Sequence, residues 1–179
     1  MSPQMRLAIF RTALLLCTAF LSACVAPSRS TVLVFPQEDA TTYSAPDGRT
    51  WLLRAKETKP DKISLTFHPK GATQEKWTEL LLSSESRNGW PIAEIRRLFT
   101  LISTEDDPKM KFTITEVDAD TFIVVYETPR WNEKGIQKVV RSVRGHRMIA
   151  YQNRLGAPGE ARYADWCRFI ERARVWDDN

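Results

Sequence analysis

The sequence predicts an α+β domain in which two main helices pack on one antiparallel β-sheet. Segments of β-type composition are joined by short turns, and short connections favour antiparallel pairing. The apolar period becomes helical twice, once in the middle of the chain and once near its C-terminus. The order is early strands, helix, four-strand meander and helix. One sheet covered by helices buries these apolar faces in an α/β/α sandwich-like arrangement.

Four candidate strands precede the first helix. One of them, from 62 to 68, alternates apolar and polar side chains, so its apolar residues should share one face. The polar stretch from 37 to 49 contains Pro46-Asp47-Gly48, which predicts a turn. The four candidates are Thr31–Phe35, Thr50–Lys56, Lys62–His68 and Lys76–Ser83.

The middle of the chain predicts one helix. Pro91 follows Asn88-Gly89 and suits the first position of a helix. Apolar residues then recur at helical spacing from Ile92 to Ile102. The sequence Asp106-Asp107-Pro108 predicts that the helix ends near Thr104.

Two hairpins are expected next, with turns at Asp118-Ala119-Asp120 and Arg144-Gly145-His146. A longer loop from 129 to 135 joins them and contains Trp131. The predicted strands are Lys111–Val117, Thr121–Glu127, Gly135–Val143 and Arg147–Asn153.

The last element is a helix that begins at Ala157–Glu160. Its apolar stripe consists of Tyr163, Trp166, Cys167, Ile170 and Ala173.

Over residues 50–176 this order of elements resembles the Mog1/PsbP-like fold. The resemblance implies an α/β/α sandwich and rests on element order alone.

The N-terminus predicts an export signal. Arg6 and Arg11 precede a ten-residue apolar block, Thr12–Leu21, which is too short to span a membrane as a helix. Leu21-Ser22-Ala23-Cys24 then resembles the lipobox of bacterial lipoproteins. That resemblance implies cleavage before Cys24 and acylation of Cys24. The predicted parts are a signal peptide (1–23), a lipidated cysteine with a tether and extended segment (24–49), and one α+β domain (50–179).

The resemblance also implies a location. Val25 is not the aspartate that favours inner-membrane retention, so the expected place is the outer membrane, facing the periplasm. Two or three acyl chains would anchor the chain firmly, at about 0.8 kcal/mol per buried methylene.

Of three cysteines, Cys17 leaves with the signal and Cys24 is lipidated. Only Cys167 remains, so no intramolecular disulfide is expected.

Charge gives little support for a nucleic-acid partner. The full chain carries 26 basic and 22 acidic residues, a net charge of +4. Arg6 and Arg11 leave with the signal, so 24 basic and 22 acidic residues remain, a balance of +2. No nucleic-acid-binding motif occurs, and the expected compartment contains no DNA.

No catalytic constellation stands out. His68 and His146 are the two histidines, and each is expected at a strand end or turn. No serine has a Gly-x-Ser-x-Gly context. Cys167 falls on the apolar stripe of the last helix, where a small buried residue is expected. A small envelope-acting hydrolase that uses one of the histidines stays open as an alternative.

Metal and cofactor sites are not predicted. Neither paired zinc ligands nor a calcium loop occurs, and the seven glycines form no nucleotide-binding pattern. The local carboxylate groups, Glu105-Asp106-Asp107 and Asp118 with Asp120, fall at a helix end and in a turn. We therefore expect no cofactor.

Two clusters remain as candidate partner-binding residues. Four basic side chains surround the second hairpin turn: Arg141, Arg144, His146 and Arg147. The planar fork of arginine suits phosphate or carboxylate groups. Arg130 and Trp131 lie together in a loop and belong to residue types enriched at binding hot spots.

These observations favour a lipid-anchored, non-enzymatic binding or accessory module of an envelope complex. The expected partners are the membrane, through the N-terminal lipid, and an envelope protein complex, glycan, anionic lipid or lipopolysaccharide. A purely structural lipoprotein without a dedicated ligand is a further alternative.

Overall fold

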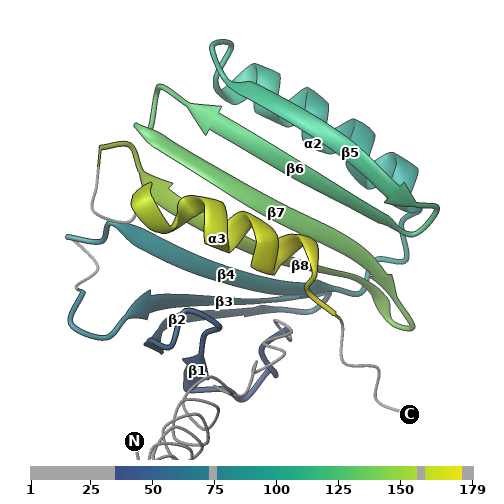
Figure 1. The fold of residues 1–179 in the computed structure, drawn as a ribbon. Coiled ribbons are helices and arrows are strands. Elements are labelled where there is room, and N and C mark those ends of the chain that lie inside the picture. The colour runs from purple at the N-terminus through teal and green to yellow at the C-terminus, as the bar shows by residue number, and fades with distance from the viewer. Residues whose placement is uncertain (1–34, 73–75, 157–159, 175–179) are drawn as a thin grey trace, which may run out of the picture. The chain divides into compact units, whose positions relative to one another are not determined.

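A computed structural model describes residues 35–72, 76–156 and 160–174 (Figure 1). Within these ranges eight strands form one sheet, in the order β1-β2-β3-β4-β8-β7-β6-β5. The strands are β1 (Thr42–Ser44), β2 (Thr50–Lys59), β3 (Lys62–Pro69), β4 (Glu79–Ser86), β5 (Lys111–Asp118), β6 (Thr121–Thr128), β7 (Glu133–Ser142) and β8 (Gly145–Arg154). The helices are α2 (Ile92–Asp106) and α3 (Glu160–Glu171).

Two antiparallel meanders meet at the centre of the sheet. Strands β1 to β4 follow one another in sequence, and α2 then carries the chain to the far edge at β5. Strands β5 to β8 return towards the centre, where β8 pairs with β4 in a register that joins Leu81 to Tyr151. All seven pairings are antiparallel, as short connections favour.

The two helices contact opposite faces of this sheet. Strand β6 shows this directly, because consecutive side chains point to opposite faces. Ile123 belongs to the core cluster that contains Trp166 and Ile170 of α3. Its neighbour Phe122 belongs to the cluster that contains Ile92 of α2. Figure 1 shows α3 across β7 and β8, and α2 behind β5.

The α+β class is therefore confirmed in its coarse form, although the sheet dominates it. Seven of the eight strands and both helices overlap with predicted elements. Strand β1 was not predicted, because the polar stretch from 37 to 49 contains no strand pattern. It pairs with β2, and Ala45 directly after it is buried.

Several boundaries differ from the predictions; β4, for example, spans Glu79–Ser86 where Lys76–Ser83 was expected. The second hairpin turns at Val143-Arg144, since Gly145 already pairs with Ser142 in the sheet. Helix α2 continues to Asp106, and the Asp107 N–H donates to the carbonyl of Ser103. Of the first predicted strand only Phe35 is described, and it lies buried outside any strand.

The predicted signal peptide and Cys24 lie outside the described residues. In the part of the chain that the structure describes, neither helix has the length and apolar character needed to cross a membrane.

Candidate binding site

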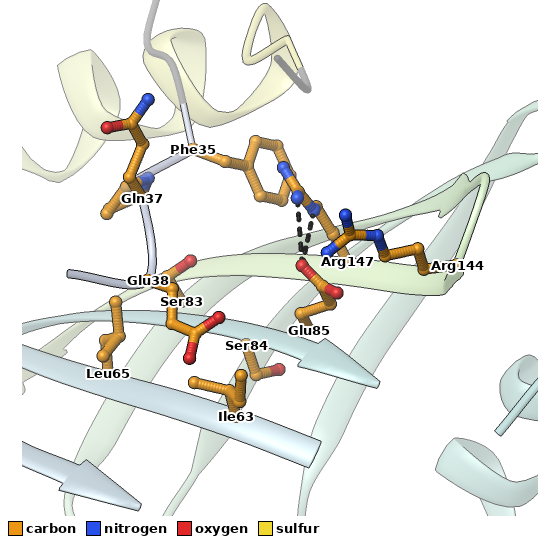
Figure 2. Close-up of a pocket in the computed structure, with 11 residues that line it drawn as sticks. Phe35, Gln37, Glu38, Ile63, Leu65, Ser83, Ser84, Glu85, Arg144 and Arg147 are labelled. Atoms are coloured by element: carbon orange, nitrogen blue, oxygen red, sulfur yellow. Dashed lines mark hydrogen bonds and ion pairs between the residues drawn. The ribbon is translucent and has the colours of Figure 1, made fainter. Parts of the chain in front are cut away.

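A pocket of about 180 Å³ opens on the face of the sheet that α3 contacts (Figure 2). We call it the hairpin pocket, because the β7–β8 hairpin forms one of its sides. It is lined by Phe35, Pro36, Gln37, Glu38, Ile63, Leu65, Ser83, Ser84, Glu85, Arg144 and Arg147.

Strand alternation explains how these side chains come together. Ile63 and Leu65 of β3 are buried and belong to the same core cluster as α3. Ser83 and Glu85 stand on the same face of β4, opposite Leu65 and Ile63 in the register. The pocket therefore has an apolar side from β3 and a polar side from β4.

An ion pair spans the polar side. Arg147 Nη2 lies 2.9 Å from Glu85 Oε2, and Arg147 Nε donates to the same oxygen at 3.1 Å. Arg87 Nε donates to the other Glu85 oxygen, also at 3.1 Å. Burial alone would raise the pKa of Glu85, but the hydrogen bonds and charges of Arg87 and Arg147 outweigh it and lower that pKa. Glu85 is thus a carboxylate already matched by two guanidinium groups.

Arg144 is the unmatched charge of the pocket. It is exposed at the hairpin tip, and among the described residues it makes no hydrogen bond or ion pair. Figure 2 shows its side chain extending towards Arg147 and Glu85. The other lining carboxylate, Glu38, lies 3.6 Å from Arg87 and 3.9 Å from Lys56. The pocket therefore offers one free guanidinium to an incoming anion.

Gly145 sets the position of this hairpin. Its φ is +143°, a conformation that side chains rarely adopt. A Cβ added there would lie 2.2 Å from the backbone oxygen of Ser86 at the end of β4. Only glycine allows β8 to begin so close to β4, and this closeness places Arg144 beside the β4 side of the pocket.

The basic cluster predicted around the hairpin turn divides between two faces. Arg147 points to the α3 face, whereas Arg141 and His146 face each other on the opposite side. Arg141 lies 3.9 Å from Asp120 across the neighbouring hairpin. The pKa of His146 is lowered by burial and by the positive charge of Lys62. Only Arg144 and Arg147 therefore line the hairpin pocket.

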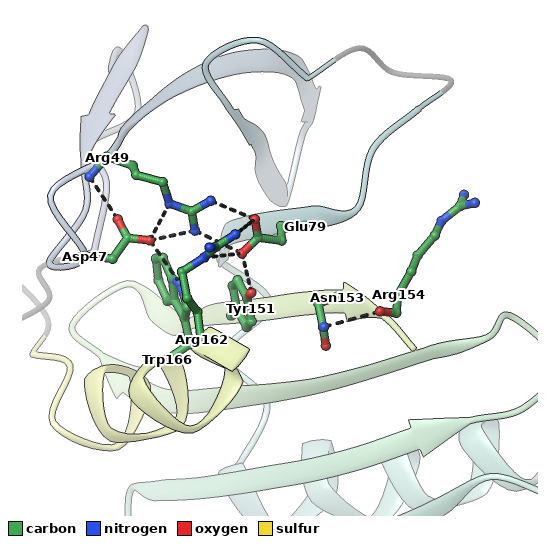
Figure 3. A network of polar contacts seen from close by, with 8 residues as sticks. All are labelled: Asp47, Arg49, Glu79, Tyr151, Asn153, Arg154, Arg162 and Trp166. Atoms are coloured by element: carbon green, nitrogen blue, oxygen red, sulfur yellow. Dashed lines mark hydrogen bonds and ion pairs between the residues drawn. The ribbon is translucent and has the colours of Figure 1, made fainter. Parts of the chain in front are cut away.

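A buried polar network lies on the same face and was not predicted (Figure 3). The Glu79 carboxylate is 3% exposed and accepts hydrogen bonds from Arg49, Arg162 and Tyr151. Asp47 accepts a hydrogen bond from Trp166 of α3 at 3.2 Å. These contacts tie α3 to β4, β8 and the turn after β1, so the network serves to hold the fold.

The loop before β7 forms a second pocket, of about 280 Å³, on the α2 face. We call it the tryptophan pocket, because Trp131 lines it with 53% of its surface exposed. Arg130 stacks on the indole ring, its Cζ 4.8 Å from the ring centroid. The pocket is lined by Ile102, Ser103, Asp106, Asp107, Met110, Tyr126, Thr128, Trp131, Glu133 and Gln152.

The candidate nucleophile and histidines lie elsewhere. His68 is buried in β3, and neither His68 nor His146 lines the hairpin or tryptophan pocket. Cys167 is half-buried on α3, and burial raises the pKa of its thiol. Among the described residues, no group of three or more histidine, cysteine or carboxylate side chains is placed to hold a metal ion.

The chain matches no known protein-family model, no curated protein and no solved structure.

Proposed function

We propose that this protein is a lipid-anchored module of the outer membrane, facing the periplasm, that binds an anionic group of another envelope component without catalysing a reaction. The hairpin pocket carries the proposal. Arg144 and Arg147 line one small pocket, and only Arg147 is matched by a carboxylate. An anion placed beside Arg144 would gain a charge-assisted hydrogen bond and reduce the repulsion between the two guanidinium groups.

The predicted lipid anchor lies close in sequence to residues that line the hairpin pocket. Phe35–Glu38 forms one side of the pocket, and Phe35 follows Cys24 by eleven residues. Eleven extended residues reach about 40 Å at most. A lipid on Cys24 would therefore keep the pocket close to the membrane surface, where phosphate and carboxylate groups of the envelope are concentrated.

The two remaining functional hypotheses receive less support. A histidine-dependent hydrolase needs a histidine in a concave site with a nucleophile, and neither histidine lines the two pockets described above. A purely structural role would make no use of the guanidinium of Arg144, which lines the pocket without an ion-pair partner among the described residues. We also propose the closer likeness to the Mog1/PsbP-like α/β/α sandwich, because the helices contact opposite faces of the sheet.

Site-specific crosslinking in intact cell envelopes tests the function. A photoreactive p-benzoylphenylalanine at Val143, which is 98% exposed and adjacent to Arg144, should capture the bound component. The matched control carries the same group at Ala119, in the exposed turn of the β5–β6 hairpin. The adduct should form from position 143, and Arg144→Gln should remove it.

Three results would contradict the proposal. They are the absence of any adduct specific to position 143, the same adduct from position 119, and an adduct that persists undiminished in Arg144→Gln.

A further inference from the structure

Trp131 lies on a loop that is ordered by hydrogen bonds to the buried side chain of Asp107. The buried carboxylate of Asp107 accepts a hydrogen bond from the Thr128 hydroxyl at 2.7 Å. It also accepts from the backbone N–H groups of Lys109 and Arg130, at 3.0 and 3.2 Å. The loop is closed by the Asn132 N–H, which donates to Pro129. An exposed indole whose loop is already ordered loses little entropy on binding, which is a property of interface hot spots.

Glu133 supplies an unmatched charge in the same pocket. Its cross-strand partner in β8 is Arg154, but the Arg154 guanidinium stacks on Trp77 with its Cζ 4.6 Å from the ring centroid. Among the described residues the Glu133 side chain makes no hydrogen bond and no ion pair within 4.0 Å. Burial raises the pKa of Glu133, and the positive charge of Arg154 offsets this only in part.

The pocket around this carboxylate has both apolar or aromatic and polar side chains, and its polar residues include Asp106 and Asp107. Met110, Tyr126 and Trp131 line the pocket, and Ile102 at its edge is 54% exposed. The Tyr126 hydroxyl already accepts a hydrogen bond from Gln152. A cation entering the pocket would meet the carboxylate of Glu133 and the indole of Trp131, on which Arg130 already stacks, and both groups stabilise positive charge.

We propose that the tryptophan pocket binds the cationic side chain, lysine or arginine, of a partner protein. The aliphatic stem of that side chain would pack on Trp131 and Met110, and its charge would pair with Glu133. The pocket lies on the α2 face, whereas the hairpin pocket lies on the α3 face. The inference does not depend on the proposed function, and the two can fail separately.

Fluorine NMR of the full-length chain in detergent micelles tests this site. The six tryptophans are replaced by 5-fluorotryptophan, and Trp131→Phe assigns the Trp131 signal. The probe is Nα-acetyl-arginine amide, and Nα-acetyl-citrulline amide is its uncharged analogue of nearly the same shape. Glu133→Gln removes the carboxylate charge. Glu127→Gln makes the same change on the opposite face of the sheet, beside Lys134 and Tyr163.

The arginine probe should shift the Trp131 signal saturably, with a millimolar Kd, and the citrulline probe should not. Glu133→Gln should weaken binding about tenfold, the usual effect of losing one hydrogen bond to a charged group. Glu127→Gln should bind as the wild type does. Unchanged positions of the other fluorotryptophan signals show that a variant is folded.

Three outcomes would overturn the proposal. The Trp131 signal could stay unchanged up to about 10 mM probe, well above the expected Kd. Both probes could shift it equally, or a folded Glu133→Gln protein could bind arginine as tightly as the wild type.

Discussion

The guanidinium of Arg49 meets the carboxylate of Glu79 with two hydrogen bonds, of 2.7 and 2.9 Å. The same carboxylate accepts a hydrogen bond of 2.6 Å from the Tyr151 hydroxyl. The Tyr151 ring stacks on Trp166 of α3, with centroids 4.5 Å apart and planes 1° from parallel. One buried charge is thus coupled to the aromatic contact that seats α3 on the sheet.

Glu79 should make the fold sensitive to acid. Burial by itself raises the pKa of Glu79, but the hydrogen bonds from Arg49, Arg162 and Tyr151 lower it to about 2. The folded-state pKa is below the ordinary 4.5, so this stabilisation is complete above pH 4.5. It is lost as the pH falls towards 2. The predicted loss is about 3 kcal/mol of unfolding free energy.

Denaturant unfolding at several pH values measures this loss. Glu79→Gln should lower stability by about 3 kcal/mol at pH 7, because it removes the buried carboxylate that pairs with both Arg49 and Arg162 and leaves Arg49 with Asp47 alone. It should also flatten the pH dependence of stability between 4.5 and 2. Glu105→Gln, near the exposed end of α2, should change neither quantity. If the unfolding free energy of Glu79→Gln fell as steeply with acid as that of the wild type, other carboxylates would be responsible for the pH dependence.

Gly145→Ala should displace the β7–β8 hairpin. The new Cβ would lie 2.2 Å from the Ser86 backbone oxygen, and φ is +143°. We expect a loss of about 2–4 kcal/mol, measured by thermal unfolding. Gly156→Ala is the control, because its φ is +72° but its Cβ meets open space. It should cost only about 1 kcal/mol. Equal losses in the two variants would mean that the close approach to Ser86 is unimportant.

Thr128→Val tests how the tryptophan loop is held. The substitution keeps the shape of the buried side chain but removes the hydroxyl that donates to Asp107. We expect a loss of about 1–2 kcal/mol in chemical unfolding. The fluorine signal of Trp131 should also change in width as the loop loosens. Thr113→Val, on exposed β5, is the control and should leave the unfolding free energy and the signal width at wild-type values. If Thr128→Val also left both unchanged, the hydrogen bond from Thr128 to Asp107 would not be needed to order the loop.

Cys24→Ala tests the predicted anchor. With no thiol to acylate, the chain should leave the membrane fraction or accumulate as an unprocessed precursor of higher mass. Fractionation and immunoblotting of cells that express either form measure this directly. Cys17→Ala is the matched control and should be processed and retained as wild type, since Cys17 belongs to the predicted signal. Normal processing and retention of Cys24→Ala would disprove lipidation at this residue.

Local patterns in the sequence were enough to predict most elements of the fold. The alternation in β3 and the helical stripe after Pro91 depend on neighbouring residues alone, and both elements formed as expected. Strand β1 has only three residues and gains its stability from pairing with β2, a contact that a local pattern does not encode. The same reasoning applies to the β4–β8 pairing at the centre of the sheet.

The candidate site was predictable only in part. The basic composition of the hairpin pointed to Arg144 and Arg147, but the alternation that sends Arg141 and His146 to the other face depended on where the turn lies. The partners of Glu79 could not be named from neighbouring residues, because Arg49 and Arg162 are 30 and 83 residues away in the sequence. A lone glutamate in an apolar strand is a signal for such a buried pair.

The central β4–β8 pairing has a consequence for how the chain folds. Each half of the sheet is a meander of neighbouring strands, which can form from contacts close in sequence. The pairing that unites the halves joins residues such as Glu85 and Arg147, 62 apart, and Glu79 and Tyr151, 72 apart. Closing so long a loop precedes any gain from the contacts it creates, so we expect this step to limit the folding rate. Ion pairs and hydrogen bonds at that central pairing would then mainly slow unfolding, and so prolong the lifetime of the native state.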